Sequence, residues 1–342
     1  MRNTINMNIA SAFSLNERQR KTLLDAAPDS QLVDRQCISG ANVLDLIRGG
    51  CDVLFTFFVP EDLLQAAPAL KWIQLISAGA DHMMKGPAGS GKLRITTTSG
   101  VHAASLAEFA ITMMLMHVHR LHATSRAQYR HQWLPAPEFM KTADTLRGKT
   151  VGIIGYGSIG RELARIAQAL GMEVLALKRD PKVLRDAGWS PAGIVGDPEG
   201  RIPRRIFGPE EREALLRESD FVVMLLPLTA ATRHFIGAKE FAVMKPNAFF
   251  VNVGRGALVD EPALIQALQD KRIAGAGLDV FEREPLPIEN PLWDMEEVIM
   301  TPHMAGPFRG YLDLACELFA QNLRRFISGQ PMLNEIDWTL GY

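Results

Sequence analysis

The sequence predicts an α/β protein with two Rossmann-like or flavodoxin-like domains, each built on a parallel sheet. Short apolar runs alternate with helical stretches in both halves of the chain, and this alternation is typical of parallel βαβ units. The length of 342 residues exceeds the roughly 250–300 residues at which a single hydrophobic core stops growing. A Pro-rich, irregular stretch at 132–148 separates the two series of elements and is expected to be a linker.

The first series covers about the first hundred residues. Residues 16–28 are expected to form a helix that begins after Asn16 and ends at Pro28. A long, largely apolar helix over 105–130 is expected to bridge the two domains. The strands of this series are predicted by short runs rich in apolar, β-branched and aromatic residues, at 8–13, 53–59, 72–77 and 94–99.

The second series ends in an amphipathic helix over 309–329, with Gly329 and Pro331 as its stop signals. Residues 186–204 carry four glycines and three prolines, and we expect a surface excursion or a hairpin there. The strands of this series are predicted at 150–155, 173–177, 220–227, 248–254, 274–280 and 298–303.

Composition excludes several classes of protein. The formal net charge is −1, whereas a nucleic-acid binder needs a basic patch or stripe. No apolar run approaches the ~18 residues of a membrane span, and the N-terminus lacks the apolar core of a signal peptide. Cys37, Cys51 and Cys316 are widely spaced, so neither a disulfide framework nor a metal site is indicated. We expect three buried thiols in a cytoplasmic protein.

A G-x-G-x-x-G sequence at 155–160 lies between an apolar strand and a helical stretch, which is the context that a dinucleotide fingerprint requires. Gly155 is expected to make the tight turn, Gly157 to let the backbone approach a pyrophosphate, and Gly160 to let helix and strand pack closely. The N–H groups near Ser158 and Ile159 would face the phosphates at the positive end of the helix.

The tip of the next strand is basic. An acid that binds the ribose 2′-hydroxyl normally stands there, but this chain has Lys178 and Arg179, followed by Asp180 and a proline. Two cations would attract a 2′-phosphate, whereas Asp180 is expected to be a turn residue. We therefore expect NADP(H) to be preferred, with NAD(H) possible as the alternative.

Three later segments each end a strand with a residue suited to catalysis: V-N-V-G-R-G (251–256), G-L-D-V-F-E-R-E-P (277–285) and T-P-H-M-A-G (301–306). Their order, with Arg255, Glu284 and His303, resembles the D-isomer-specific 2-hydroxyacid dehydrogenases. The resemblance covers nearly the whole chain, because further landmarks of that family occur at 77–82, 100–103, 146–155 and 226–229.

The chemistry of these three residues agrees with the resemblance. Reduction of a 2-keto acid needs a hydride donor, a proton donor and an anchor for the carboxylate. An imidazole exchanges protons near neutral pH, so His303 is the expected proton donor. Glu284 would hold its tautomer and favour the charged form, and Arg255 would bind the carboxylate and polarise the keto oxygen.

The resemblance implies further site residues and an architecture. The backbone N–H groups of Ala78 and Gly79 would complete the substrate-carboxylate site, together with Arg255 and His303. Asp279 would bind the nicotinamide carboxamide. The substrate domain is expected to comprise residues 1–118 plus 308–342 and the cofactor domain residues 119–307, with two crossings between them and a homodimer formed through the cofactor domain. The cofactor pocket would also include Leu226, Pro227, Val253 and Gly306.

Within this family, Glu284 stands where a formate dehydrogenase would have glutamine. With the basic tip at Lys178 and Arg179, which favours NADPH as the reductant, we expect reduction of glyoxylate, hydroxypyruvate or a similar small 2-keto acid to the D-2-hydroxy acid. Phe57, Phe58 and Met304 are expected near the pocket and leave open a bulkier 2-keto acid such as phenylpyruvate. A third hypothesis is a non-catalytic, nucleotide-sensing scaffold similar to the corepressors that share this fold.

Overall fold

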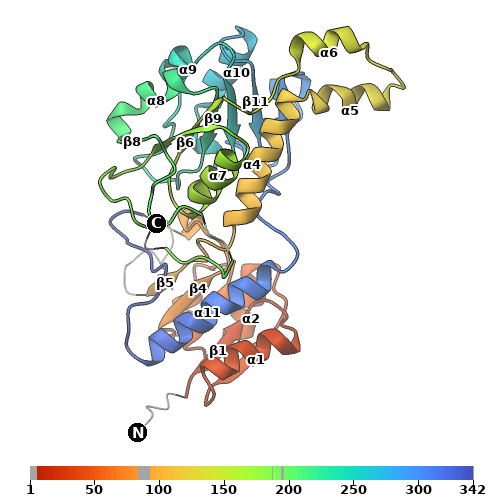
Figure 1. Cartoon of the computed structure of the whole chain (residues 1–342). Coiled ribbons are helices and arrows are strands. Elements are labelled where there is room, and N and C mark those ends of the chain that lie inside the picture. The colour runs from red at the N-terminus through yellow and green to blue at the C-terminus, as the bar shows by residue number, and fades with distance from the viewer. Residues whose placement is uncertain (1–5, 84–92, 187, 194–195, 342) are drawn as a thin grey trace. The chain divides into compact units, whose positions relative to one another are not determined.

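The computed structural model describes residues 6–83, 93–186, 188–193 and 196–341 (Figure 1). These residues form two compact units. Unit 1 consists of the described residues of Met1–His102, Gly188–Pro191 and Phe308–Tyr342. Unit 2 consists of those of Ala103–Ala187 and Ala192–Pro307. The chain therefore passes between the units four times, not twice as the sequence led us to expect.

Unit 1 is built on a five-stranded parallel sheet with the order β2-β1-β3-β4-β5. This is the flavodoxin-like order, so the expected fold class is confirmed for this unit. The strand β2 was not predicted, because only its two central residues, Leu32 and Val33, are apolar. The strands are β1 (Asn8–Ser11), β2 (Gln31–Asp34), β3 (Val53–Thr56), β4 (Trp72–Leu75) and β5 (Arg94–Thr96).

Helices cover both faces of this sheet. The α1 helix (Glu17–Ala26) and the α11 helix (Tyr311–Ile327) pack side by side on one face, as Figure 1 shows. Phe55, Trp72 and Phe319 meet there, with ring centroids 5.1–5.2 Å apart. The α2 helix (Gly40–Ile47) and the α3 helix (Leu63–Ala66) cover the other face. The predicted start of α1 is confirmed, because Asn16 and Gln19 form a capping box.

Unit 2 is built on a seven-stranded parallel sheet with the order β12-β11-β10-β9-β6-β7-β8. This is the doubly wound Rossmann order with one additional strand. The order reverses between β6 and β9, so the loop after β6 lies at the switch point where ligands of such sheets bind. The strands are β6 (Thr150–Ile154), β7 (Glu173–Leu177), β8 (Arg205–Phe207), β9 (Phe221–Met224), β10 (Phe249–Asn252), β11 (Gly275–Leu278) and β12 (Val298–Met300).

Two layers of helices enclose the sheet of unit 2. The α4 helix (Ala103–Val118) packs on α7 (Ser158–Ala169) over one face. The other face is covered by α8 (Arg212–Glu218), α9 (Ala238–Val243) and α10 (Glu261–Gln269). Short 3-10 turns complete the unit at Pro209–Glu211, Gly256–Leu258 and Pro291–Asp294.

The expected helix over 105–130 is wrong as a single element. Arg120 adopts a left-handed conformation (φ 54°) and separates α4 from α5 (Leu121–Tyr129). The α4 helix belongs to unit 2 rather than to a domain that ends at residue 118, because its apolar side chains pack on α7, β10 and β11. After α5, the α6 helix (Ala136–Thr142) completes an arm that projects from unit 2 (Figure 1).

The segment 186–204 is not the surface excursion or hairpin that its glycines and prolines suggested. Trp189 is only 8% exposed and packs against Val101 and Leu318 in unit 1. Asp197 is buried in unit 2, where it accepts hydrogen bonds from Tyr156 and from two backbone N–H groups. The segment therefore contributes to the cores of both units.

Two further expectations concern the whole chain. Cys37, Cys51 and Cys316 are buried and unbridged, which confirms the three expected thiols. In the described part of the chain, no helix combines the length and the apolar character that crossing a membrane requires.

His117 gives unit 2 a pH-dependent stability. The ring lies on α4 and stacks on Phe249, with ring centroids 4.1 Å apart. Burial lowers the pKa of His117 to about 4, helped by the positive charge of Arg120. Because the unfolded chain binds this proton at a higher pH, stability is lost as the pH falls from about 6.5 towards 4.

We predict that His117→Phe, which keeps an aromatic ring against Phe249, reduces the loss of stability on acidification. The expected difference is about 1–2 kcal/mol at pH 5, measured as the change in unfolding free energy between pH 7 and pH 5 in urea. The exposed His119 provides the matched control, His119→Phe, whose pH dependence should equal that of the wild type. An identical acid sensitivity in the His117 variant would contradict the assignment.

Candidate active site

The predicted catalytic residues of unit 2 follow three adjacent parallel strands. Arg255 comes after β10, Glu284 after β11 and His303 after β12. The glycine-rich loop follows β6 in the same sheet. Because the carboxyl ends of parallel strands meet at one edge, the structure brings these residues to the same side of the sheet.

His303 and Glu284 form a hydrogen-bonded pair. The imidazole Nδ1 lies 2.7 Å from Glu284 Oε2, and both side chains are partly exposed. The second carboxylate oxygen, Oε1, accepts the Phe281 N–H at 3.0 Å, which fixes the direction of the carboxylate. With Nδ1–H directed at Glu284, the other ring nitrogen, Nε2, is the atom that a substrate would meet.

Asp279 holds the segment that carries His303. Its carboxylate is buried and accepts hydrogen bonds from the Thr301 hydroxyl (2.7 Å), the Met304 N–H (2.8 Å) and the Ala305 N–H (3.0 Å). Its carbonyl accepts the N–H of His303, whose backbone is left-handed (φ 52°). These hydrogen bonds to Asp279 keep His303 in a backbone conformation that a non-glycine residue rarely adopts.

Asn252 holds the backbone around Arg255 with side-chain hydrogen bonds. It is buried, donates from Nδ2 to the Arg255 carbonyl (3.0 Å) and accepts the Gly254 N–H (3.1 Å). Gly256 lies so close to the main chain of Phe281 that a Cβ atom would stand 1.9 Å from the Phe281 carbonyl carbon. The loops that carry Arg255 and Glu284 are therefore in direct contact.

The glycine-rich loop fits a dinucleotide pyrophosphate. Gly155 is left-handed (φ 110°), and a Cβ at Gly160 would lie 2.4 Å from the Gly155 carbonyl oxygen. A Cβ at Gly157 would meet no protein atom within 4 Å and would project into open space. The Arg161 N–H donates to the Gly157 carbonyl (3.0 Å), so Ser158 and Ile159 lie in the first turn of α7, whose N–H groups have no intrahelical acceptor.

The basic tip of β7 adopts a tight turn. Lys178 is half-buried and donates from Nζ to the Val183 carbonyl, and burial lowers the pKa of its ammonium group. Arg179 is exposed. Asp180 accepts the Lys182 N–H at 2.9 Å, so the expectation that it is a turn residue is confirmed.

The remaining expected cofactor residues lie along the same edge. Leu226 and Pro227 follow β9, and the Pro227 carbonyl accepts the Thr232 hydroxyl (2.7 Å). Val253 is buried after β10. Gly306 follows Ala305, whose carbonyl accepts the Ser105 hydroxyl at 2.7 Å.

Ala78 and Gly79, expected to bind the substrate carboxylate, belong to unit 1. They follow β4, and the Ser77 side chain donates to the Gly79 carbonyl at 2.8 Å. The neighbouring Ser77 carbonyl accepts the Thr98 N–H (3.0 Å). These bonds fix the loop at the carboxyl end of the sheet of unit 1.

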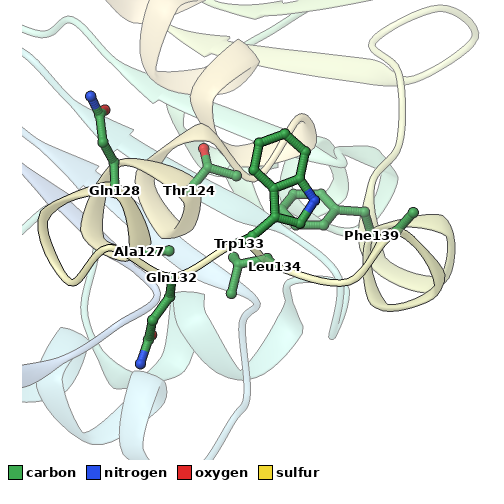
Figure 2. Close-up of a pocket in the computed structure, with 8 residues that line it drawn as sticks. Thr124, Ala127, Gln128, Gln132, Trp133, Leu134 and Phe139 are labelled. Carbon is green, nitrogen blue, oxygen red and sulfur yellow. The ribbon is translucent and has the colours of Figure 1, made fainter.

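A groove of about 510 Å³ lies elsewhere, on the arm formed by α5 and α6. Figure 2 shows Trp133, Leu134 and Phe139 around it. None of the expected catalytic or cofactor residues lines this groove.

Sequence reasoning missed two residues of the site and part of the role of a third. Asn252 and Thr301 lie inside the quoted motifs, but their partners are fixed only by the adjacency of β10, β11 and β12. For Asp279 we expected only a contact with the carboxamide of the nicotinamide. The structure shows that its carboxylate also accepts three hydrogen bonds from the His303 segment. A polar residue at the end of a buried strand was the available signal.

Comparison with known proteins gives one consistent result. A family model described as the NAD binding domain of D-isomer specific 2-hydroxyacid dehydrogenase matches residues 111–305. A glyoxylate reductase from Thermococcus litoralis is 35% identical over 283 residues, which are 81% of this chain and 80% of that protein. A glyoxylate reductase from Aeropyrum pernix is 35% identical over 298 residues, 84% of this chain and 83% of that protein.

Solved structures are similar over nearly their whole length. A D-isomer specific 2-hydroxyacid dehydrogenase from Xanthobacter autotrophicus, in complex with NADPH and MES, has a TM-score of 0.78 at 28% identity. The match covers 99% of this chain and 100% of that one. An NADPH-dependent glyoxylate/hydroxypyruvate reductase from Sinorhizobium meliloti, in complex with NADP and sulfate, has a TM-score of 0.75 at 26% identity. The match covers 98% of this chain and 99% of that one.

We predict that Gly157→Ala folds normally and binds the cofactor poorly. The added methyl group meets no protein atom but occupies the space that a pyrophosphate needs. The expected rise in KM for NADPH is at least about tenfold, equivalent to about 1.4 kcal/mol, with an unchanged melting temperature. Gly49→Ala, at another glycine with no neighbour within 4 Å, is the matched control. Normal cofactor affinity in the Gly157 variant would be incompatible with this site.

Proposed function

The chain belongs to the D-isomer-specific 2-hydroxyacid dehydrogenase family, and from this premise we propose that it reduces glyoxylate, hydroxypyruvate or a similarly small 2-keto acid to the D-2-hydroxy acid with NADPH. It is an NAD(P)-dependent oxidoreductase. The observation that carries the proposal is the 2.7 Å pair of His303 and Glu284 on the sheet edge that also bears Arg255 and the glycine-rich loop.

The residues of unit 2 divide the chemistry among them. The bound nicotinamide supplies the hydride. His303 donates a proton from Nε2 to the keto oxygen, while Glu284 holds Nδ1–H and stabilises the charged ring. Arg255 binds the substrate carboxylate with its guanidinium fork. Asp279 holds the His303 segment and would also bind the carboxamide of the nicotinamide.

The proposed substrate class is supported by relatives. Glyoxylate reductases from several archaea match about four-fifths of this chain at 33–36% identity. The solved reductase from Sinorhizobium meliloti acts on glyoxylate and hydroxypyruvate according to its description. Both substrates are small 2-keto acids, whose carboxylate the fork of Arg255 can bind and whose reduction needs one hydride, supplied by the nicotinamide when bound, and one proton, supplied by His303.

The proposed preference for NADPH is supported by the tip of β7. Lys178 and Arg179 stand where an acid would select NADH. The nearest acid, Asp180, is directed into its own turn by the bond to the Lys182 N–H. The two related structures described with NADPH or NADP support the same assignment.

We predict that the wild type reduces glyoxylate or hydroxypyruvate faster than pyruvate or phenylpyruvate, with a kcat/KM for NADPH well above that for NADH. Lys178→Ala combined with Arg179→Ala should raise the KM for NADPH by about 10²-fold, the loss of two charge-assisted contacts of about 1.5 kcal/mol each. Its KM for NADH should not increase. Lys182→Ala, on the same turn, is the control.

Three results would contradict these assignments separately. A clear NADH preference of the wild type would refute the cofactor proposal. Faster reduction of phenylpyruvate would favour the bulkier substrate class. Tight binding of NADPH without turnover of any keto acid would favour the nucleotide-sensing scaffold.

We further propose a homodimer formed through the arm of α5 and α6 in unit 2. Trp133 is 97% exposed and Met140 84% exposed. Large apolar side chains gathered on one segment are typical of an interface. The groove beside Trp133 offers a second copy of the arm an apolar surface (Figure 2).

Light scattering after gel filtration should therefore give twice the chain mass for the wild type. Trp133→Ser combined with Met140→Ser should shift the mass towards that of one chain, because it removes the apolar side chains of the arm. Trp293→Ser, which changes an exposed tryptophan outside the arm, should leave the dimer intact. A wild type that elutes as a monomer would refute the proposal.

A further inference from the structure

Arg161 is a buried cation that neither the catalytic residues nor the fingerprint accounts for. It is the residue after the last glycine of the loop, in the first turn of α7, and only 2% of it is exposed. A buried guanidinium is costly unless its N–H groups are bonded. Its contacts therefore indicate which part of the molecule it holds together.

Among the described residues, the side-chain hydrogen bonds and the ion pair of Arg161 lie in the segment between β7 and β8. One terminal nitrogen, Nη2, donates to the Leu184 carbonyl at 2.6 Å, and the other, Nη1, donates to the Asp197 carbonyl. The Nε atom lies 3.6 Å from Asp186 Oδ2. The planar guanidinium thus joins Leu184 and Asp186, which follow β7, to Asp197, which lies nearer to β8.

Residues bonded to Arg161, or next to them in sequence, also contact the two parts of the proposed cofactor site, the glycine-rich loop and the basic tip of β7. On one side, Tyr156 of the glycine-rich loop donates to Asp197 Oδ2 at 2.6 Å, and the Arg161 guanidinium lies 4.9 Å above the Tyr156 ring. On the other side, Lys178 donates to the carbonyl of Val183, the residue before Leu184. Arg161 therefore supports the turn that begins at the basic tip of β7.

Residues 188–191 of the segment are packed in unit 1. Between Asp186 and Asp197 the chain enters unit 1, where Trp189 is buried against Val101 and Leu318. A Cβ at Gly100 would lie 1.9 Å from the Trp189 carbonyl oxygen. Arg161 therefore joins Leu184 to Asp197, the two ends of a segment that is also held between them by the packing of Trp189.

We propose that Arg161 is a positioning residue for cofactor selection: by joining Leu184 to Asp197 it holds the turn from which Lys178 and Arg179 bind the 2′-phosphate of NADPH. Arg161 itself touches neither the reacting atoms nor the pyrophosphate. This inference rests on the proposed NADPH preference.

The test compares Arg161→Gln and Arg161→Lys with the wild type. Glutamine removes the fork and the charge, whereas lysine keeps the charge but cannot bridge two carbonyls with a planar fork. Arg165→Gln is the matched control, because Arg165 lies one turn further along α7 and pairs with Glu162 instead. Thermal unfolding of each variant establishes that it is folded.

The readouts are KM for NADPH and NADH, kcat at saturation, and inhibition by 2′,5′-ADP and 5′-AMP as probes of the adenosine end alone. Both Arg161 variants are expected to raise the KM for NADPH and the inhibition constant of 2′,5′-ADP by about tenfold, a loss of about 1.4 kcal/mol. The values for NADH and 5′-AMP should change less than about twofold, and kcat should not change.

Several results would overturn the proposal. Equal effects on NADPH and NADH would make Arg161 a general structural residue. Full rescue by lysine would mean that its charge, not its fork, is what matters. If glutamine at position 161 prevents folding, the lysine variant alone decides between these outcomes.

The failure of this proposal is distinguishable from failure of the proposed function. If the wild type binds 2′,5′-ADP no better than 5′-AMP, the NADPH preference itself is wrong. If the wild type discriminates and the Lys178 and Arg179 substitutions abolish that discrimination while the Arg161 variants retain it, only the role of Arg161 is wrong.

Discussion

The buried carboxylate of Asp279 is the interaction on which the candidate active site depends. Burial of a carboxylate costs several kcal/mol unless its oxygens are bonded, and here three donors of the segment 301–305 supply those bonds. Each hydrogen bond to a charged group contributes about 1.5–3 kcal/mol. The donors come from the segment that follows the neighbouring strand, so the bonds that offset the burial of Asp279 also hold the backbone on both sides of His303.

The parallel sheets explain why such a site forms. In unit 2 every strand ends at the same edge, so loops distant in sequence become neighbours: Gly256 touches Phe281, and Asn252 holds Arg255. The reversal of strand order between β6 and β9 leaves the glycine-rich loop at this edge. Topology links the fold to the proposed chemistry, because one sheet edge carries the glycine-rich loop, Arg255 and His303, the residues to which we assign cofactor binding, carboxylate binding and proton donation.

The sequence predicted the elements with strong periodicity or clear caps, such as α1 after Asn16 and the strands on either side of Gly155. It did not predict β2 or β8, because only two apolar residues stand between polar or glycine neighbours in each. The break at Arg120 has no glycine or proline in the sequence to mark it, so the pattern did not reveal it. The segment 186–204 resembled a loop in composition, yet Trp189 and Asp197 are buried by residues far away in sequence. Contacts such as Arg161 with Leu184 need the folded chain, since no local pattern encodes them.

The most direct test of the account is the turnover of His303→Ala at saturating NADPH and keto acid. If Asp279 and Glu284 hold His303 as the proton donor, kcat falls by about 10²–10⁴, while the dissociation constant of NADPH remains that of the wild type. An unchanged kcat would remove His303 from the reaction and contradict the account.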